Sequence, residues 1–157
     1  GANTFGCVIN GEVLIPKNSN GIPQARGLEV YHKNNNNLII DVNNYSNTNA
    51  NGSIYIYIYD LTSTGIFPLD LSEGLTDFHF KPNYSHIWCR TFDSNSGSKK
   101  YISTSNSGSI SITQFDTTNN LVSGTFNNLT LTNIDNPNDI IEITDGRFDI
   151  NLNTVNN

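Results

Sequence analysis

The sequence has little charge and very few basic residues. Lysine and arginine together number 8 among 157 residues, charged residues make up 14%, and the net charge is −6. An average soluble domain carries roughly 25% charged residues. The basic residues are scattered, so no positive stripe is present to neutralise nucleic-acid phosphates or to hold an anionic membrane surface. Nucleic acid is therefore not an expected partner.

Long apolar runs and methionine are also missing. No stretch of 18 consecutive apolar residues occurs, so the sequence predicts no membrane-spanning helix. The chain contains no methionine and no signal peptide precedes Gly1. These features suggest that an N-terminal segment has been removed, and an export signal is one such segment.

Asparagine replaces charged residues as the main source of polarity. The chain has 27 asparagines, including four in succession at 34–37. Asparagine favours turns over helix interiors. The dipeptide Asn10-Gly11 accepts the positive φ angles of a type I′ turn, so a β-hairpin is predicted over residues 4–16. A second hairpin is predicted over residues 28–43, around the four asparagines.

Short alternating segments follow one another along the chain, and no helical period extends over ten residues. Residues 61–76 are expected to be irregular. Further strands are predicted at 53–60, 77–80, 85–92, 99–103, 108–115, 121–132 and 140–149. This spacing predicts one all-β domain over residues 1–157, an antiparallel β-sandwich of about nine to eleven short strands, with a lipocalin-like closed β-barrel as the alternative.

The segment 53–60 alternates isoleucine with tyrosine. Its two faces carry Ile54, Ile56 and Ile58 on one side and Tyr55, Tyr57 and Tyr59 on the other. We expect the isoleucines in the core and the tyrosines packed under a loop or against neighbouring strands, where each buried hydroxyl needs a partner. The alternative is an exposed aromatic face that binds a ligand, with Trp88 and Phe92 as further stacking surfaces.

Residues 121–149 give the clearest strand pattern, two alternating runs joined by a polar loop, and predict a long antiparallel pair. Alternation places Arg147 and Asp149 on one face, continuing the face of Ile143. We interpret the pair as a structural clamp rather than a ligand contact, because an unpaired buried charge is costly.

Two glycines interrupt the same strand pair. Gly124 and Gly146 each stand within an alternating run. A glycine in a strand marks a β-bulge or a close approach of another group to the backbone. Both are therefore expected to have structural roles.

Cys7 and Cys89 are the only cysteines. In an exported protein an even number invites a disulfide, which would stabilise the fold by about 4–5 kcal/mol in the chain-entropy model. The alternative is two buried free thiols. Cys89 is not expected to act as a nucleophile with His86, because three positions along a strand place the side chains on opposite faces.

Signatures of catalysis and metal binding are missing. His32, His79 and His86 lie in separate segments without metal-ligand spacing, and we interpret them as surface or rim residues. The loops 93–97 and 135–139 lack the glutamate of a calcium loop. There is also no nucleophile elbow and no phosphate-binding loop, so we expect no metal, no cofactor and no enzyme activity. A hydrolase would need distant carboxylates to meet, from among Asp41, Asp60, Glu73 and Glu142.

Two parts of the chain resemble a known family. Thr4-Phe-Gly-Cys-Val-Ile-Asn-Gly-Glu12, together with Ser123-Gly-Thr-Phe126 and Ile143-Thr-Asp-Gly-Arg-Phe-Asp149, is similar in order and separation to an uncharacterised family of small exported domains from Gram-negative Bacteroidota, many of them lipoproteins. Family members carry tryptophan where this chain has Leu14, and an aromatic residue where it has Asn128. The resemblance implies an all-β fold and an envelope or surface location, and it brings no known activity.

We therefore expect a non-enzymatic domain of an exported cell-envelope lipoprotein, periplasmic or at the cell surface, with a binding or scaffolding role. It would be a monomer that meets the membrane only through a lipid anchor on a removed N-terminal segment, and its partner would be an envelope protein. The alternative is a lipocalin-like or carbohydrate-binding module that holds a small ligand or glycan on aromatic residues. Buried tyrosines would favour the first hypothesis, and an apolar cavity or an exposed tyrosine row the second.

Overall fold

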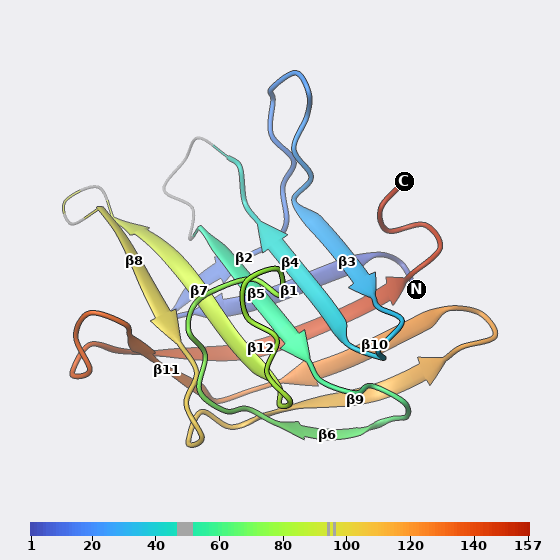
Figure 1. The fold of residues 1–157 in the computed structure, drawn as a ribbon. Coiled ribbons are helices and arrows are strands. Elements are labelled where there is room, and N and C mark those ends of the chain that lie inside the picture. The colour runs from blue at the N-terminus through green and yellow to red at the C-terminus, as the bar shows by residue number, and fades with distance from the viewer. Residues whose placement is uncertain (47–51, 94, 96) are drawn as a thin grey trace.

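The computed structural model describes residues 1–46, 52–93, 95 and 97–157, and the regular structure of this part is entirely β (Figure 1). The prediction of an all-β fold is confirmed. The described part has twelve strands, namely β1 (Thr4–Ile9), β2 (Glu12–Leu14), β3 (Leu28–His32), β4 (Leu38–Asn43), β5 (Ser53–Ile58), β6 (Gly65–Pro68), β7 (His86–Asp93), β8 (Gly97–Ile102), β9 (Ser109–Asp116), β10 (Leu121–Phe126), β11 (Leu129–Asn133) and β12 (Ile140–Asn151).

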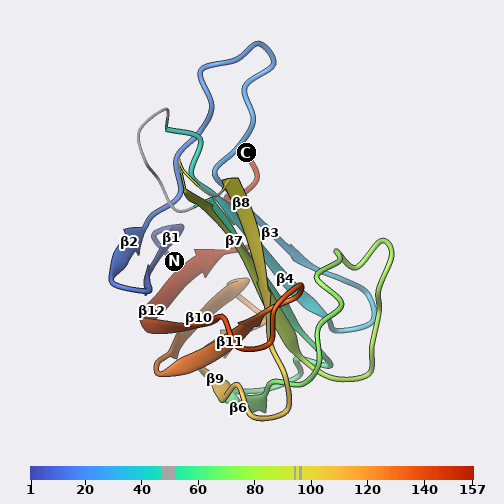
Figure 2. The ribbon, with the colours of Figure 1, turned by 90° about the vertical axis from the view of Figure 1, so that its left-hand side faces the viewer.

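The strands pair antiparallel in one continuous sheet that folds over into two layers (Figure 2). One layer has the order β3-β4-β5-β7-β8. In the other, β12 pairs with β1 on one side and with β10 and β11, end to end, on the other, while β2 and β9-β6 extend this layer outwards. The layers join where β8 meets β11, and the order ends at β3 and β6. The sheet is thus open and consistent with the predicted sandwich, and the alternative of a closed barrel is wrong.

The turn predictions follow from residues that tolerate positive φ. Asn10 and Gly11 have φ angles of 50° and 86° and connect β1 to β2. Asn36, with φ of 61°, turns the chain between β3 and β4. Most other residues would be strained in this region of φ. Both predicted hairpins are confirmed, with their turns at the asparagines that predicted them.

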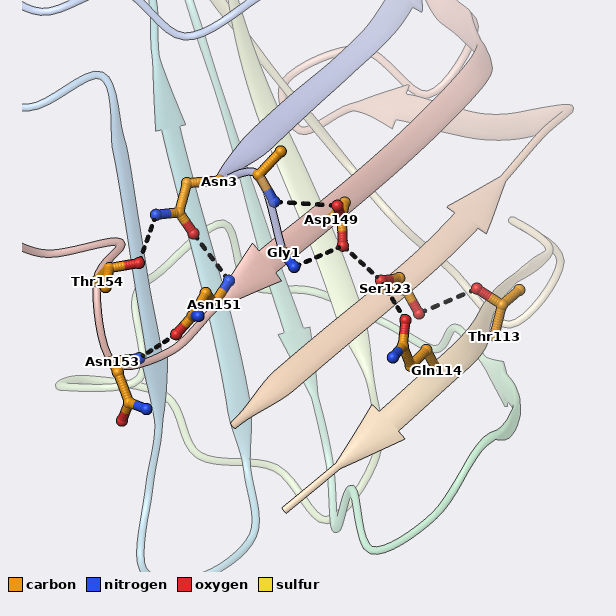
Figure 3. Close-up of polar contacts among 10 residues, drawn as sticks. Gly1, Asn3, Thr113, Gln114, Ser123, Asp149, Asn151, Asn153 and Thr154 are labelled. Carbon is orange, nitrogen blue, oxygen red and sulfur yellow. Dashed lines mark hydrogen bonds and ion pairs between the residues drawn. The ribbon is translucent and has the colours of Figure 1, made fainter. Parts of the chain in front are cut away.

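The edge of β3 is covered by the C-terminal segment. The side-chain amide of Asn156 donates to the Val30 carbonyl at 2.7 Å and accepts from the Val30 N–H at 3.1 Å, as a neighbouring strand would. Asn3 holds the same segment, since it donates to Thr154 Oγ1 at 2.9 Å and accepts from the Asn151 N–H at 2.8 Å (Figure 3). Side chains thus satisfy an edge that the open sheet leaves unpaired.

Two segments differ from the strand prediction. Residues 65–68, expected to be irregular, form β6 beside β9. Residues 77–80, expected to be a strand, instead form a turn. The N–H groups of His79 and Phe80 both donate to the Thr76 carbonyl in it. The chain from 69 to 85, which we call the covering segment, lies over the outer face of β5 and β7 (Figure 2).

β12 contains a β-bulge at Asp145, whose φ is 53°. Gly6 of β1 pairs with Arg147 and Val8 pairs with Thr144, so β12 has one residue more than β1 between the two pairs. An extra residue in one strand bends the strand and reverses its alternation beyond that point.

The bulge corrects one expectation about β12. Ile143 and Phe148 are both buried in the core, although simple alternation assigns them to opposite faces. Arg147 and Asp149 therefore share a face with each other, as expected, but that face points away from the core and not along the side of Ile143. The period of two holds on each side of Asp145 and fails across it.

Candidate functional site

The aromatic residues of β5 and β7 form a small second core outside the sandwich. Tyr55, Tyr57 and Trp88 cluster with Ile39 of β4, and the exposed fractions of the three aromatic side chains are 2%, 1% and 9%. The rings of Tyr55 and Trp88 stack with centroids 5.5 Å apart. We call this cluster the aromatic layer. The prediction that the tyrosines of 53–60 pack under a loop is confirmed for Tyr55 and Tyr57, whereas Tyr59 is exposed.

The covering segment satisfies the polar tips of the aromatic layer. The Tyr55 hydroxyl accepts from the Asp77 N–H at 2.8 Å, and the Trp88 Nε1–H donates to the Leu75 carbonyl at 3.0 Å. The Tyr57 hydroxyl donates to the Pro82 carbonyl at 3.3 Å. Burial raises the pKa of Tyr55 well above its ordinary value. These groups are used inside the protein and are not presented to a ligand.

Two lysines attach the covering segment to the sheet. Lys100 Nζ donates to the Gly74 carbonyl at 2.7 Å and lies 5.0 Å from the ring centroid of Trp88. Lys33 Nζ lies 3.1 Å from Asp77 Oδ2. A cation over an aromatic face is attracted by the ring electrons. Lys100 therefore contacts both the covering segment and the aromatic layer.

His86 belongs to this layer, which corrects its interpretation as a surface or rim residue. It is fully buried, with Nδ1 3.0 Å from Ser72 Oγ and its ring centroid 5.1 Å from those of Tyr57 and Phe80. Nε2 is buried without a hydrogen-bond partner in the described chain. Burial lowers the pKa of His86 to about 4, so the ring is neutral at pH 7. His32 and His79 are exposed, as expected.

Of the five proposed stacking residues, Tyr59 and Phe92 remain at the surface, with exposed fractions of 40% and 55%. Phe92 pairs with Ser98 between β7 and β8, while Tyr59 borders a groove of about 300 Å³. The structure does not bring all five residues together. The groove is lined by Tyr59, Phe67, Pro68, Leu69, Asp70, Tyr84 and Ser85.

Ser85 connects the two sides of the groove, which are formed by Tyr59 and by Asp70. Its hydroxyl accepts from the Tyr59 N–H at 3.0 Å, and its carbonyl accepts from the Asp70 N–H at 2.9 Å. The Asp70 carbonyl in turn accepts from Ser103 Oγ at 2.7 Å. Sequence analysis missed Asp70 and Tyr84, because they lie in irregular chain and meet Tyr59 only through these contacts.

Two further hollows flank the C-terminal segment, with volumes of about 480 and 490 Å³. Both have mainly polar linings. The first includes Arg26 and Asn157, and the second includes His32, Lys33 and Asn156. Asparagine side chains on the edge of the sandwich account for much of these surfaces.

Asp149 gathers contacts on the outer face of β12 (Figure 3). Oδ1 accepts from Ser123 Oγ at 2.8 Å and lies 3.7 Å from the Gly1 amino group, while Oδ2 accepts from the Ala2 N–H at 3.0 Å. The Ser123 bond, followed by the Ala2 bond, holds the pKa of Asp149 below its ordinary value. Arg147 is exposed and forms no ion pair with Asp149 in the described chain. The structural clamp of Arg147 and Asp149 stays a prediction, and these contacts on the outer face are all made by Asp149.

Gly124 and Gly146 form two reciprocal pairs with phenylalanine across β10 and β12. Gly124 pairs with Phe148, and Phe126 pairs with Gly146. A Cβ at Gly124 would lie 2.5 Å from Phe148 Cζ and 2.8 Å from the Ser111 carbonyl oxygen, and a Cβ at Gly146 would overlap the ring of Phe126. Each ring occupies the space that a side chain would need, so both glycines are close approaches of the expected kind.

Cys7 and Cys89 are both free and buried, so the disulfide considered above is not formed. Burial raises the pKa of Cys7 to about 12, and burial with the nearby Cys7 raises the pKa of Cys89. A thiol with a raised pKa is a poor nucleophile. Cys89 faces the main core whereas His86 faces the aromatic layer, as alternation predicts.

Carboxylates do not gather into a metal site in the described residues, where no group of three or more histidine, cysteine, aspartate or glutamate side chains is placed to hold an ion. Asp139 of the 135–139 loop instead accepts bonds from Tyr101 and Asn133. The loop 93–97 includes positions 94 and 96, which lie outside the described residues. Asp41 accepts from Asn43 Nδ2 at 3.0 Å, and burial raises its pKa.

Comparison of the chain with protein-family models, with curated proteins and with solved structures gave no match. Among the residues described, none belongs to a helix with the length and apolarity needed to cross a membrane.

Proposed function

We propose that this chain is a binding or scaffolding domain of an exported cell-envelope lipoprotein, without enzyme activity of its own. The family resemblance described above motivates the envelope location and the lipid anchor. The partner would be another envelope protein, and the domain itself would be a monomer. A rigid β-sandwich suits such a role, because rigid elements present surface loops in fixed positions.

One observation carries the scaffolding half of this proposal. Tyr55, Tyr57 and Trp88 are buried under the covering segment, and their polar atoms are bonded to its backbone. Aromatic residues used in this way stabilise a segment of chain and do not form a platform for a ligand. Buried tyrosines were the feature expected to favour a scaffold over a module.

Expression of the full-length precursor in its native cells, with an alkyne-labelled fatty acid, tests the location. We expect the label on the protein and the protein in the envelope fraction. An unlabelled protein in the cytosolic fraction would disprove the proposed envelope location. A variant in which the acylated cysteine of the precursor is replaced supplies the control, since it should lose the label and keep its fold.

A second candidate function is the binding of a small ligand or glycan, and the groove beside Tyr59 favours it. Small-molecule sites are concave and mostly apolar, with a few placed polar groups, and volumes start at about 300 Å³. A glycan array with the protein and with Tyr59→Ala tests it. Binding that Tyr59→Ala removes and Tyr31→Ala preserves would favour the module, because Tyr31 is similarly exposed but lies on β3.

A further inference from the structure

The groove beside Tyr59 combines aromatic walls with polar atoms that the fold leaves unused. The hydroxyls of Tyr59 and Tyr84 have no hydrogen-bond partner among the described residues, although both side chains line the groove. Asp70 Oδ1 accepts from the Leu71 N–H at 2.8 Å, while Oδ2 has no partner in the described chain. The aromatic layer differs, because its hydroxyls and indole N–H are already bonded.

The groove is electrically negative. Asp70 is the one charged residue among those that line it, and no lysine, arginine or histidine is among them. Burial, followed by the charges of Asp70 and then Glu73, raises the pKa of Tyr84, so both carboxylates act on the Tyr84 hydroxyl. A phosphate or carboxylate ligand would be repelled here, whereas a cation would be attracted.

The size and rigidity of the groove limit what it can hold. About 300 Å³ admits a compact ligand and not an extended chain. Ser85, which is 4% exposed, bonds to both walls, so Tyr59 and Asp70 keep their separation when nothing is bound. Preorganised walls lower the entropy lost on binding.

From these features we infer that the groove binds a small organic cation, an ammonium group carried on an apolar body. Aromatic rings attract an ammonium group, three aromatic residues line the groove, and Asp70 adds a full negative charge. A neutral sugar would find hydroxyl partners but would gain nothing from the negative potential. This inference rests on the second candidate function, and it names the ligand class for that site.

Choline is a suitable probe, because 3,3-dimethyl-1-butanol has the same shape without the charge. NMR titration of the ¹⁵N-labelled protein should show choline shifting amides around Tyr59, Asp70 and Tyr84, with a dissociation constant on the order of millimolar. The uncharged alcohol should bind at least about fivefold more weakly. Added salt should weaken choline binding, because the charges are only partly shielded from solvent.

Variants assign the effect to the groove. Asp70→Asn should weaken choline binding about five- to tenfold, and Tyr84→Ala should weaken it by a similar factor. Glu12→Gln, which removes an exposed carboxylate on β2, is the matched control and should leave binding unchanged. Unfolding curves of the variants show whether each keeps its fold.

Four results would overturn the inference. Equal binding of choline and its uncharged isostere, or binding of methyl β-D-glucopyranoside alone at these residues, would overturn the cation and leave ligand binding as the function of the groove. Choline binding that Asp70→Asn does not weaken would place the cation elsewhere. No shift with any of the three probes would overturn the inference, and a glycan array without binding that depends on Tyr59 would then overturn the second candidate function as well.

Discussion

The aromatic layer and the glycine–phenylalanine pairs are two ways of packing rings against a sheet. Between β10 and β12, glycine leaves room for each ring, and the rings carry no polar atom. On the outer face of β5 and β7, the rings carry hydroxyls and an indole N–H, and the covering segment supplies a backbone partner for each. The first region depends on volume alone, whereas the second depends on hydrogen bonds and on a neutral histidine.

The largest effect should come from filling the space beside a phenylalanine. Gly124→Ala places Cβ against Phe148 and the Ser111 backbone, and Gly146→Ala places it in the ring of Phe126. We expect each to lower the free energy of unfolding by about 3 kcal/mol, the upper range for an overpacked core. Urea unfolding followed by circular dichroism gives the value.

Gly65→Ala is the matched control, because a Cβ there meets nothing within 4 Å and the residue also lies in a strand. It should change stability by less than about 0.5 kcal/mol. Phe126→Leu should partly restore Gly146→Ala, since it removes the ring that the new methyl meets. A loss at Gly65 as large as at Gly146 would show that backbone freedom, and not ring contact, governs these positions.

The aromatic layer should be sensitive to acid, where the glycine–phenylalanine pairs are not. The pKa of His86 is about 4 in the folded protein and 6.5 ordinarily, so the unfolded chain binds its proton more readily. The stability due to neutral His86 is complete above pH 6.5 and is lost as pH falls towards 4, by about 3 kcal/mol in all.

His86→Phe keeps a ring in the layer and removes the titration. Its unfolding free energy should fall less between pH 6.5 and 4 than that of the unmodified protein. Asp41, whose pKa burial raises, contributes equally to both curves, so their difference reports His86. Three carboxylates with lowered pKa values lose their contribution to stability only at lower pH, near and below 3.8. They are Asp116, Asp139 and Asp149. Urea unfolding at half-unit pH steps, followed by Trp88 fluorescence, measures the difference. Parallel pH curves for both proteins would refute the role of His86.

The sequence was more informative about the strands and the glycine–phenylalanine pairs than about the aromatic layer and its covering segment. Alternation and the asparagine turns at 10–11 and 34–37 predict most strands, and the positions of Gly124 and Gly146 predict close approaches. The bulge at Asp145 was missed because an extra residue leaves the pattern alternating on either side. The covering segment was misread because its contacts join residues far apart in the chain, as Asp77 joins Tyr55. The groove was missed for the same reason.

A smaller effect should follow from removing one hydroxyl of the aromatic layer. Tyr55→Phe keeps the stacked ring but leaves the Asp77 N–H without its acceptor, which should cost about 1 kcal/mol. Tyr59→Phe is the control on the same strand pattern, because its hydroxyl has no partner in the described chain and the change should be near zero. Thermal and urea unfolding of both variants check this. A loss for Tyr55→Phe as small as that for Tyr59→Phe would mean that ring packing, and not the hydroxyl bond, stabilises the layer.

Effects of similar or smaller size should arise on the outer face of β12, behind the glycine–phenylalanine pairs. Asp149→Ala removes the acceptor for Ser123 and Ala2 and should cost about 1 kcal/mol, since these bonds are partly exposed. Asp149→Asn keeps an acceptor oxygen and should recover part of that loss. Arg147→Ala should change stability by less than about 0.5 kcal/mol, as expected of an exposed residue without an ion pair to Asp149. Urea unfolding of the three variants tests the clamp directly, because a two-residue clamp requires Arg147 and Asp149 to show equal losses, whereas these contacts assign the role to Asp149.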